Sequence, residues 1–186
     1  LRLKKAGNDL MTLVGGRAIH PVNVKVGGFY RMPTKLEMLA LRPSLARGLE
    51  EAFETIKLVA TFDFPEMEQA YEYVALHPPD YYAIERGTVI STSGAAFPVR
   101  EFPEHVKEFH VQHSNALHAQ FDGGMYMVGP LARYTLNFAQ LSERCKAAAK
   151  EAGLGETCRN PFKSIIVRAV ELAYAFEEAL RIIDEW

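Results

Sequence analysis

The chain has 186 residues, a formal net charge of −2 at neutral pH, and 48% hydrophobic against 24% charged residues. This length and balance are typical of a globular protein with a sizeable core and exclude a wholly disordered chain. The slight negative charge excludes a global basic field that would attract nucleic acid or an anionic membrane. No apolar run approaches the ~20 residues of a membrane span, and the apolar start of the chain is too short for a signal peptide. Two cysteines are too few for a disulfide framework, which favours a reducing, cytoplasmic setting.

The first segment, residues 1–14, is predicted to be a helix. Its apolar residues recur at helical spacing, and Gly15 and Gly16 predict its end. No N-cap residue precedes Leu1, no C-cap follows Trp186, and the first residue is not methionine. From these features we expect a chain that continues beyond both ends.

A short extended stretch and a second helix are predicted next. Valines alternate at positions 22, 24 and 26, which is the period of a strand. Because His20 precedes Pro21, we expect its backbone outside the right-handed helical region. Thr34 and Glu37 have the spacing of a capping box, so a helix is expected to follow and to run to about residue 60. Pro43 predicts a break or kink within that helix.

The middle of the chain is predicted to be rich in β-structure, from about residue 70 to residue 130. Residues 88–92 have the composition of a strand. Residues 121–128 are interpreted as strand, turn and strand, because Asp122-Gly123 is a strong hairpin signal. The stretch 104–120 fits either a strand or a helix.

Two helices are predicted in the last third. Asn137 is expected to cap a helix that runs to about Glu151, with Gly153 beyond its end. Asn160 and Pro161 are expected to be the N-cap and first residue of the final helix, whose apolar stripe continues almost to the end of the chain. The predicted fold class is α+β: long helices over residues 1–62 and 137–186, with a small antiparallel β-rich insert at about 70–130.

Side chains able to bind metals are present without a recognisable ligand spacing. Cys145 and Cys158 lack the close pairing of zinc or cluster ligands, so we interpret them as packed free thiols. Four histidines fall in one short segment, but neither helix nor strand spacing brings three of them together, and structural histidines are the favoured interpretation. These four are His105, His110, His113 and His118. The glycine-rich phosphate loops and the Gly-x-Ser-x-Gly elbow are also missing.

Three sequence blocks resemble the large subunit of nickel–iron hydrogenases. Residues 15–21, Gly-Gly-Arg-Ala-Ile-His-Pro, resemble that family's Gly-Gly-Lys/Arg-x-x-His-Pro segment, and residues 129–133 match its Gly-Pro-Leu-Ala-Arg motif. Residues 160–171 look like the helix that follows in the soluble, cytoplasmic, multi-subunit branch. The blocks occur in the family's order and span nearly the whole chain. The resemblance implies a helical scaffold and, for the parent complex, reversible oxidation of dihydrogen to protons and electrons.

The family's metal-binding cysteine motifs are both missing from the sequence. They are an N-terminal Arg-x-Cys-Gly-x-Cys-x-x-x-His and a C-terminal Asp-Pro-Cys-x-x-Cys-x-x-His, and Cys145 and Cys158 match neither. The Ala-Pro-Arg-Gly stretch is missing too. Without thiolate ligands we expect no nickel–iron centre and no catalytic residue in this chain. The chain is therefore interpreted as an internal fragment of the alpha subunit, inactive by itself, lying between the two cysteine motifs.

The resemblance also implies roles for particular residues. The family's histidine of the His-Pro pair lies near the proximal iron–sulfur cluster of the small subunit, so His20 and Arg17 are expected on the electron path or at the subunit interface. A polar turn residue fixed by Pro21 is the other interpretation of His20. The remaining motif residues are expected to be structural: Gly15, Gly16, Pro21, Gly129, Pro130 and Arg133.

The implied partners are a small subunit with iron–sulfur clusters and further electron-acceptor subunits. Neither nucleic acid nor a membrane span is expected, and the expected location is cytoplasmic. Two alternatives stay open: a metal-free binding or assembly module on the same scaffold, and a respiratory-complex subunit related to hydrogenases. The sequence does not distinguish a nicotinamide, a deazaflavin or sulfur as electron acceptor, and it leaves the physiological direction and the oligomeric state open.

Overall fold

The computed structural model describes all residues from Leu1 to Trp186 and groups them into two compact units. The helical unit comprises residues 1–59 and 169–186, and the sheet unit comprises residues 60–168. The α+β class predicted from the sequence is confirmed. None of the helices combines the length and the hydrophobicity that a membrane crossing requires.

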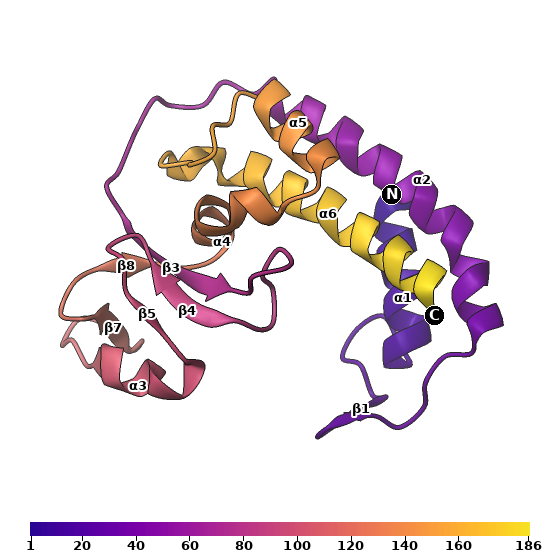
Figure 1. The fold of residues 1–186 in the computed structure, drawn as a ribbon, viewed down its shortest axis with the longest axis horizontal. Helices are drawn as coiled ribbons and strands as arrows, with labels where there is room; N and C mark the ends of the chain where they lie inside the picture. The colour runs from indigo at the N-terminus through magenta and orange to yellow at the C-terminus, as the bar shows by residue number, and fades with distance from the viewer. The chain divides into compact units, whose positions relative to one another are not determined.

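The helical unit is built from three helices and a small hairpin (Figure 1). Its elements are α1 (Arg2–Gly15), β1 (Val24–Lys25), β2 (Gly28–Phe29), α2 (Lys35–Ala60) and the greater part of α6 (Ser164–Glu185). Phe176 of α6 packs so closely on α2 that a Cβ added to Gly48 would lie 2.5 Å from its ring. Near the end of α6, Asp184 contacts Arg42 of α2 with N–O distances of 2.6 and 2.9 Å.

The predicted end of α1 and the predicted start of α2 are both confirmed. Gly16, at φ 84°, terminates α1 and donates its N–H to the carbonyl of Thr12. At the start of α2 the capping box is formed in both directions. Thr34 donates its N–H to Glu37 Oε2 at 2.8 Å, and Glu37 donates its N–H to Thr34 Oγ1 at 3.3 Å.

A break at Pro43 is wrong, because α2 continues from Lys35 to Ala60. A proline in a helix removes the hydrogen bond to the carbonyl four residues earlier, here that of Leu39. The side chain of Leu39 is exposed, so water can reach this part of the helix. Nearby, Ser44 Oγ donates to the carbonyl of Leu41 at 2.8 Å, which supplies one polar contact within the same turn.

The sheet unit contains a four-stranded sheet and a separate two-stranded ribbon (Figure 1). The sheet has the order β5-β4-β3-β8, and the ribbon pairs β6 with β7. The strands are β3 (Glu72–His77), β4 (Thr88–Ser91), β5 (Ala96–Phe97), β6 (Val106–Phe109), β7 (His118–Phe121) and β8 (Tyr126–Met127). A core cluster of Val74, Val89, Phe97 and Phe121 packs between the sheet and the ribbon. Strand β4 confirms the strand that the sequence predicted at residues 88–92.

The helices and turns of the sheet unit follow the strands in the chain or connect them. They are η1 (Val99–Glu101), α3 (Phe102–His105), α4 (Pro130–Asn137), η2 (Phe138–Gln140), α5 (Glu143–Glu151) and η3 (Pro161–Lys163). Asn160 accepts a hydrogen bond from the N–H of Phe162, as predicted for an N-cap, and the chain enters α6 through the 3₁₀ turn η3. At the other end of α5, Gly153 has φ 76°, as expected beyond a helix end.

The turn at Asp122-Gly123 is confirmed, but the hairpin expected from it is wrong. Phe121 and Gly124 exchange backbone hydrogen bonds across the turn. Beyond that bridge the two strands separate: β7 pairs antiparallel with β6, and β8 pairs parallel with β3. The insert is therefore not purely antiparallel. A tight turn reverses the chain only locally, and the partner of each strand is chosen by non-local packing.

Asn137 is not the predicted helix cap. It is the last residue of α4 and is fully buried, whereas Ser142 caps α5 by accepting a hydrogen bond from the N–H of Cys145. Asparagine at a helix start and asparagine buried in a polar network give the same local sequence signal. Only the side chains around Asn137, which come from distant strands and turns, distinguish the two.

Candidate subunit interface

The loop between α1 and α2, residues 16–34, carries the first motif and is called the interface loop. Asn23 holds its centre. The Asn23 side-chain amide donates to the carbonyls of Val14 and Arg31 at 2.8 and 2.6 Å, and its oxygen accepts the N–H of Arg31 at 2.9 Å. The N–H groups of Val22 and Asn23 also both donate to the carbonyl of Gly15. One side chain thus ties the start of the loop to its end.

The glycines of the motif stand where a side chain would collide with the loop. A Cβ at Gly15 would lie 2.9 Å from Pro21 Cβ, and Gly16 has φ 84°, in the left-handed region that favours glycine. Pro21 therefore packs directly on the end of α1. This geometry accounts for Gly15, Gly16 and Pro21 as residues that shape the backbone.

Arg17 and His20 lie on the outer side of this turn. His20 has φ 51°, so its backbone lies outside the right-handed helical region as expected, but in the left-handed region rather than an extended one. Arg17 Nε donates to the carbonyl of His20 and so closes the turn. Both side chains are exposed, which leaves the imidazole of His20 accessible from outside the loop.

The far end of the loop is fixed by an ion pair to α2. Arg31 contacts Glu37 with N–O distances of 3.0 and 3.1 Å, and Glu37 also accepts hydrogen bonds from Thr34. The hydrogen bond from Arg31, followed by those from Thr34, lowers the pKa of Glu37 to about 2. The same carboxylate thus caps α2 and anchors the loop.

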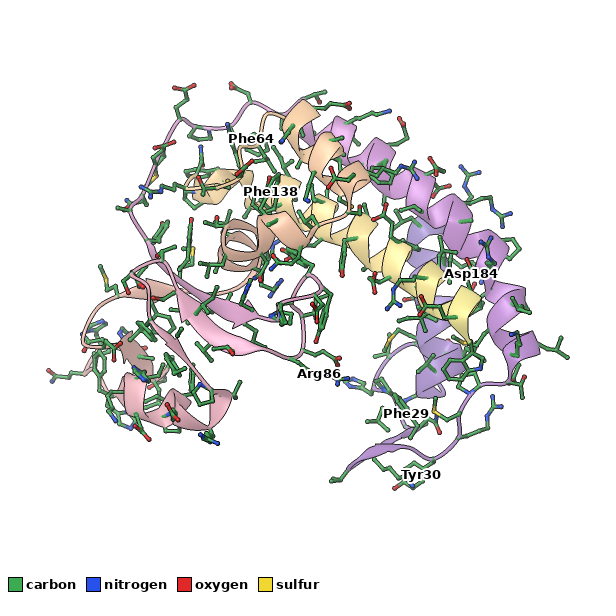
Figure 2. All side chains as sticks on the ribbon, viewed as in Figure 1. Phe29, Tyr30, Phe64, Arg86, Phe138 and Asp184 are labelled. Carbon is green, nitrogen blue, oxygen red and sulfur yellow. The ribbon has the colours of Figure 1, made fainter.

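The outer surface of the interface loop is apolar with a basic rim. Its exposed large apolar residues are Ile19, Val22, Val24, Val26, Phe29, Tyr30 and Met32. Figure 2 labels two of them, Phe29 and Tyr30, at the β1–β2 hairpin. No aspartate or glutamate occurs between Leu10 and Leu36, whereas Arg17 and Lys25 contribute positive charge. Exposed apolar residues grouped on one loop are typical of a surface that a partner covers.

Sequence reasoning missed Asn23, the residue that organises the loop. The available signal was an asparagine between two valines in a glycine-flanked segment, and asparagine side chains often bond to nearby backbone groups in loops. Which backbone groups Asn23 would reach depends on the path of the loop, which alternating valines alone do not define.

The second motif, residues 129–133, starts α4 in the sheet unit. Gly129 is the N-cap with φ 94°, Pro130 is the first helical residue, and Arg133 donates its N–H to the carbonyl of Gly129 at 2.9 Å. The Arg133 side chain lines a cavity of about 400 Å³ whose other lining residues are apolar, among them Val74 and Phe102. Gly129 and Pro130 therefore set the start of the helix, and Arg133 is the one charged residue on the cavity wall.

No family model matches the chain. It is 32% identical over 190 residues to sulfhydrogenase 1 subunit alpha of Pyrococcus furiosus and 28% identical over 189 residues to sulfhydrogenase 2 subunit alpha of the same organism. Both comparisons cover all of this chain, but only 44% and 42% of the relatives. The chain thus spans less than half the length of the curated relatives that it matches.

Solved hydrogenase structures share the fold. An NAD⁺-reducing [NiFe]-hydrogenase in the H2-reduced state superposes with a TM-score of 0.77 at 17% identity, over 95% of this chain and 45% of that one. A [NiFeSe]-hydrogenase from Dm. baculatum gives a TM-score of 0.67 at 18% identity, over 97% and 47%. Over its whole length the chain is thus similar to part of a sulfhydrogenase alpha subunit and has the fold of the corresponding part of solved nickel–iron hydrogenases.

The two cysteines of this chain do not fit a nickel–iron centre, which takes several thiolate ligands. Cys145 is fully buried in α5, and Cys158 is buried with its thiol 3.7 Å from the carbonyl of Asn160. Burial raises the pKa of Cys158, which opposes the thiolate form that a metal ligand needs. No three side chains among histidine, cysteine, aspartate and glutamate are grouped to hold a metal ion.

The four clustered histidines serve different contacts. His105 stacks on Phe97 with ring centroids 3.8 Å apart and lies 3.0 Å from an oxygen of Asp122. The rings of His113 and His118 meet edge to face at 6.1 Å. His105 is therefore part of the aromatic packing at the core, while His110, His113 and His118 lie exposed on the β6–β7 ribbon and its connecting loop.

Proposed function

We propose that the chain is a segment of the large (alpha) subunit of a cytoplasmic nickel–iron hydrogenase and contributes scaffold and subunit interface. The parent complex would oxidise dihydrogen reversibly to protons and electrons. The observation that carries this proposal is similarity along the whole chain to a sulfhydrogenase alpha subunit, with the three motif blocks in order. The chain itself supplies no metal ligand, so the isolated chain is expected to be inactive.

The interface loop is the surface proposed to contact the small subunit with its iron–sulfur clusters. Its apolar side chains gain about 25 cal/mol for each Å² removed from water, and its basic rim suits a partner face that carries carboxylates. Asn23 and the Arg31–Glu37 pair hold the loop before the partner arrives, which lowers the entropy lost on binding. Further electron-acceptor subunits complete the proposed complex.

His20 is proposed to act beside the electron path. Its exposed imidazole stands at the turn that Arg17 closes, so its ring can donate a hydrogen bond to a group of the partner. Hydrogen bonds to cluster sulfurs stabilise the reduced cluster and raise its potential. Arg17 would hold the turn that presents His20.

The complex tests this proposal directly. Purified from its natural source through a tag on this polypeptide, it should carry nickel and iron, contain an iron–sulfur small subunit and reduce a viologen dye with dihydrogen. The isolated chain should contain no stoichiometric nickel. A complex without nickel and without dihydrogen-dependent dye reduction would instead support a metal-free assembly module.

The interface is tested by placing a charge at the hairpin tip. Val26 is fully exposed, so Val26→Asp leaves the fold intact but buries a carboxylate in the proposed interface. We expect small-subunit binding to weaken by about 30-fold or more, the effect of losing one strong interface contact of about 2 kcal/mol. Met125→Asp, at a similarly exposed site of the sheet unit, is the matched control and should leave binding unchanged.

His20→Gln tests the electron path separately from assembly. We expect the complex to assemble normally while the reduction potential of the nearest iron–sulfur cluster shifts in an EPR-monitored titration. An unchanged potential would leave His20 only the role of a polar turn residue.

A further inference from the structure

Three polar side chains meet inside the sheet unit, where β3, α4 and η2 end. His77 Nδ1 lies 2.9 Å from Asn137 Oδ1, and Gln140 Nε2 lies 3.3 Å from the same ring nitrogen. Asn137 is fully buried, while His77 is half-buried. None of the three belongs to a motif that the resemblance contributed.

The surroundings of Asn137 determine where the hydrogen of His77 resides. The Asn137 amide nitrogen donates to the carbonyls of Leu76 and Arg133 at 3.0 and 3.1 Å. Both partners are acceptors only, so the amide cannot be turned around, and its oxygen must face His77. An oxygen accepts, and therefore His77 Nδ1 carries a hydrogen and donates it to Asn137.

The amide of Gln140 fits this assignment when its oxygen, rather than its nitrogen, faces the ring. Its Oε1 is buried without a hydrogen-bond partner, and its nitrogen faces a ring nitrogen that already carries a hydrogen. Turning the Gln140 amide by 180° exchanges its oxygen and nitrogen. The oxygen then becomes a second acceptor for the Nδ1 hydrogen of His77.

The other ring nitrogen, Nε2, is consequently a bare acceptor in the neutral ring. Both hydrogen-bond contacts of the ring are made at Nδ1, and Nε2 is not a buried atom without a partner, so in this half-buried ring it lies within reach of water. An imidazole whose Nδ1–H is held by an amide or carboxylate oxygen, with Nε2 open, is the arrangement of a positioned base. Histidine is also the side chain that exchanges protons most readily near neutral pH.

We propose that His77 is a proton-transfer residue for the dihydrogen oxidation of the parent complex, an inference that rests on the function proposed above. The Nε2 lone pair forms an N–H bond as an O–H bond of a protonated water breaks. The imidazolium then returns that proton from Nε2 to the next water. No electron is exchanged, and the Nδ1 hydrogen stays on His77 in its hydrogen bond to Asn137, so the ring shuttles protons at Nε2 alone. Asn137 and Gln140 are positioning residues.

The test uses the complete dihydrogen-oxidising complex carrying His77→Asn. Asparagine keeps a nitrogen donor near the position of Nδ1, which preserves the contact with Asn137, but it has no Nε2 acceptor. We expect turnover to fall by about 10²-fold, the low end of what a positioned proton-transfer group contributes. Added imidazole should restore a large part of it, and His113→Asn, at an exposed histidine, should match the wild type.

Each remaining outcome is decisive. Unchanged turnover in His77→Asn, with an active wild type, overturns the inference and leaves the proposed function standing. A loss that imidazole does not restore assigns His77 a packing role and also overturns it. A wild-type complex that does not oxidise dihydrogen overturns both. Independently of activity, neutron diffraction should find deuterium on Nδ1 of His77, and a ring deuterated only on Nε2 contradicts the inference.

Discussion

The interface loop and the β3–β4 sheet hold their backbones in opposite ways. In the loop the apolar side chains point outward, and polar contacts of Asn23 and Arg31 hold the chain. In the sheet, Val74 and Val89 are buried and pack with Phe97 and Phe121. Burial of apolar side chains stabilises the sheet, whereas the loop leaves its large apolar side chains exposed. Substitutions in the sheet should therefore act through lost apolar burial, and substitutions in the loop through lost hydrogen bonds.

The largest effect is expected in the core of the sheet unit. Phe121 is 4% exposed and packs against Phe97, so Phe121→Ala leaves a cavity. The free energy of unfolding of the sheet unit should fall by about 3–5 kcal/mol, measured by urea denaturation. Phe109→Ala, at a ring on the exposed face of β6, is the control and should cost much less. Equal losses would contradict the assigned core.

A glycine pair in the same unit separates backbone crowding from backbone conformation. A Cβ at Gly87 would lie 2.6–2.8 Å from backbone atoms of His77, and its φ is 137°. Gly87→Ala should cost about 3 kcal/mol, the sum of strain and overpacking. Gly123→Ala has φ 81° but open space, so it should cost only about 1 kcal/mol. Thermal unfolding of both variants measures the difference.

In the interface loop, the substitution expected to weaken the local structure most is Asn23→Ala. It removes three side-chain hydrogen bonds, to Val14 and Arg31, at about 0.5–1.5 kcal/mol each. We expect local opening of residues 16–34 to become easier by about 2 kcal/mol, seen as faster hydrogen exchange there. Exchange in the β3–β4 strands should not change. A uniform acceleration across the protein would show that the loop is not an independent local structure.

The smallest effect on local stability is expected when the pH is lowered. The pKa of Glu37 is lowered from 4.5 to about 2, so its stabilising contribution is fully present above pH 4.5 and is lost as the pH falls towards 2. Protection of amides at the start of α2 should decline across that window. In Glu37→Gln, protection should be lower at neutral pH and flat over the same range. An acid response that survives this substitution would assign the titration to another carboxyl group.

Local signals in the sequence predicted much of the fold. Thr34 with Glu37, Gly16 and Asn160 each determine a helix end through contacts within a few residues, and the structure has those ends. The turn at Asp122 is of the same kind. The break considered at Pro43 does not occur, because a helix of 26 residues that packs along one side tolerates the loss of one hydrogen bond.

The candidate site was predicted only in part. The motif directed attention to His20 and Arg17, and both are exposed on one turn. Asn23 was missed because its partners include Arg31, eight residues away across a hairpin. His77 and Asn137 were missed because sixty residues separate them, and a pattern in either segment gives no sign of the other.

By itself, the sequence determined the composition class, the end of α1, the start of α2, the tight turn at Asp122-Gly123 and the absence of cysteine ligands at motif spacing. Each of these follows from residues that are near neighbours in the chain. Only the tertiary structure decided that β8 joins β3 in parallel, that Asn137 is buried beside His77, and that Asn23 ties the interface loop together. These arrangements depend on contacts between segments that are far apart in the chain. Several strands could pair with the same sheet edge, and several donors could reach the same unpaired carbonyl, so the partners are determined only in the folded chain.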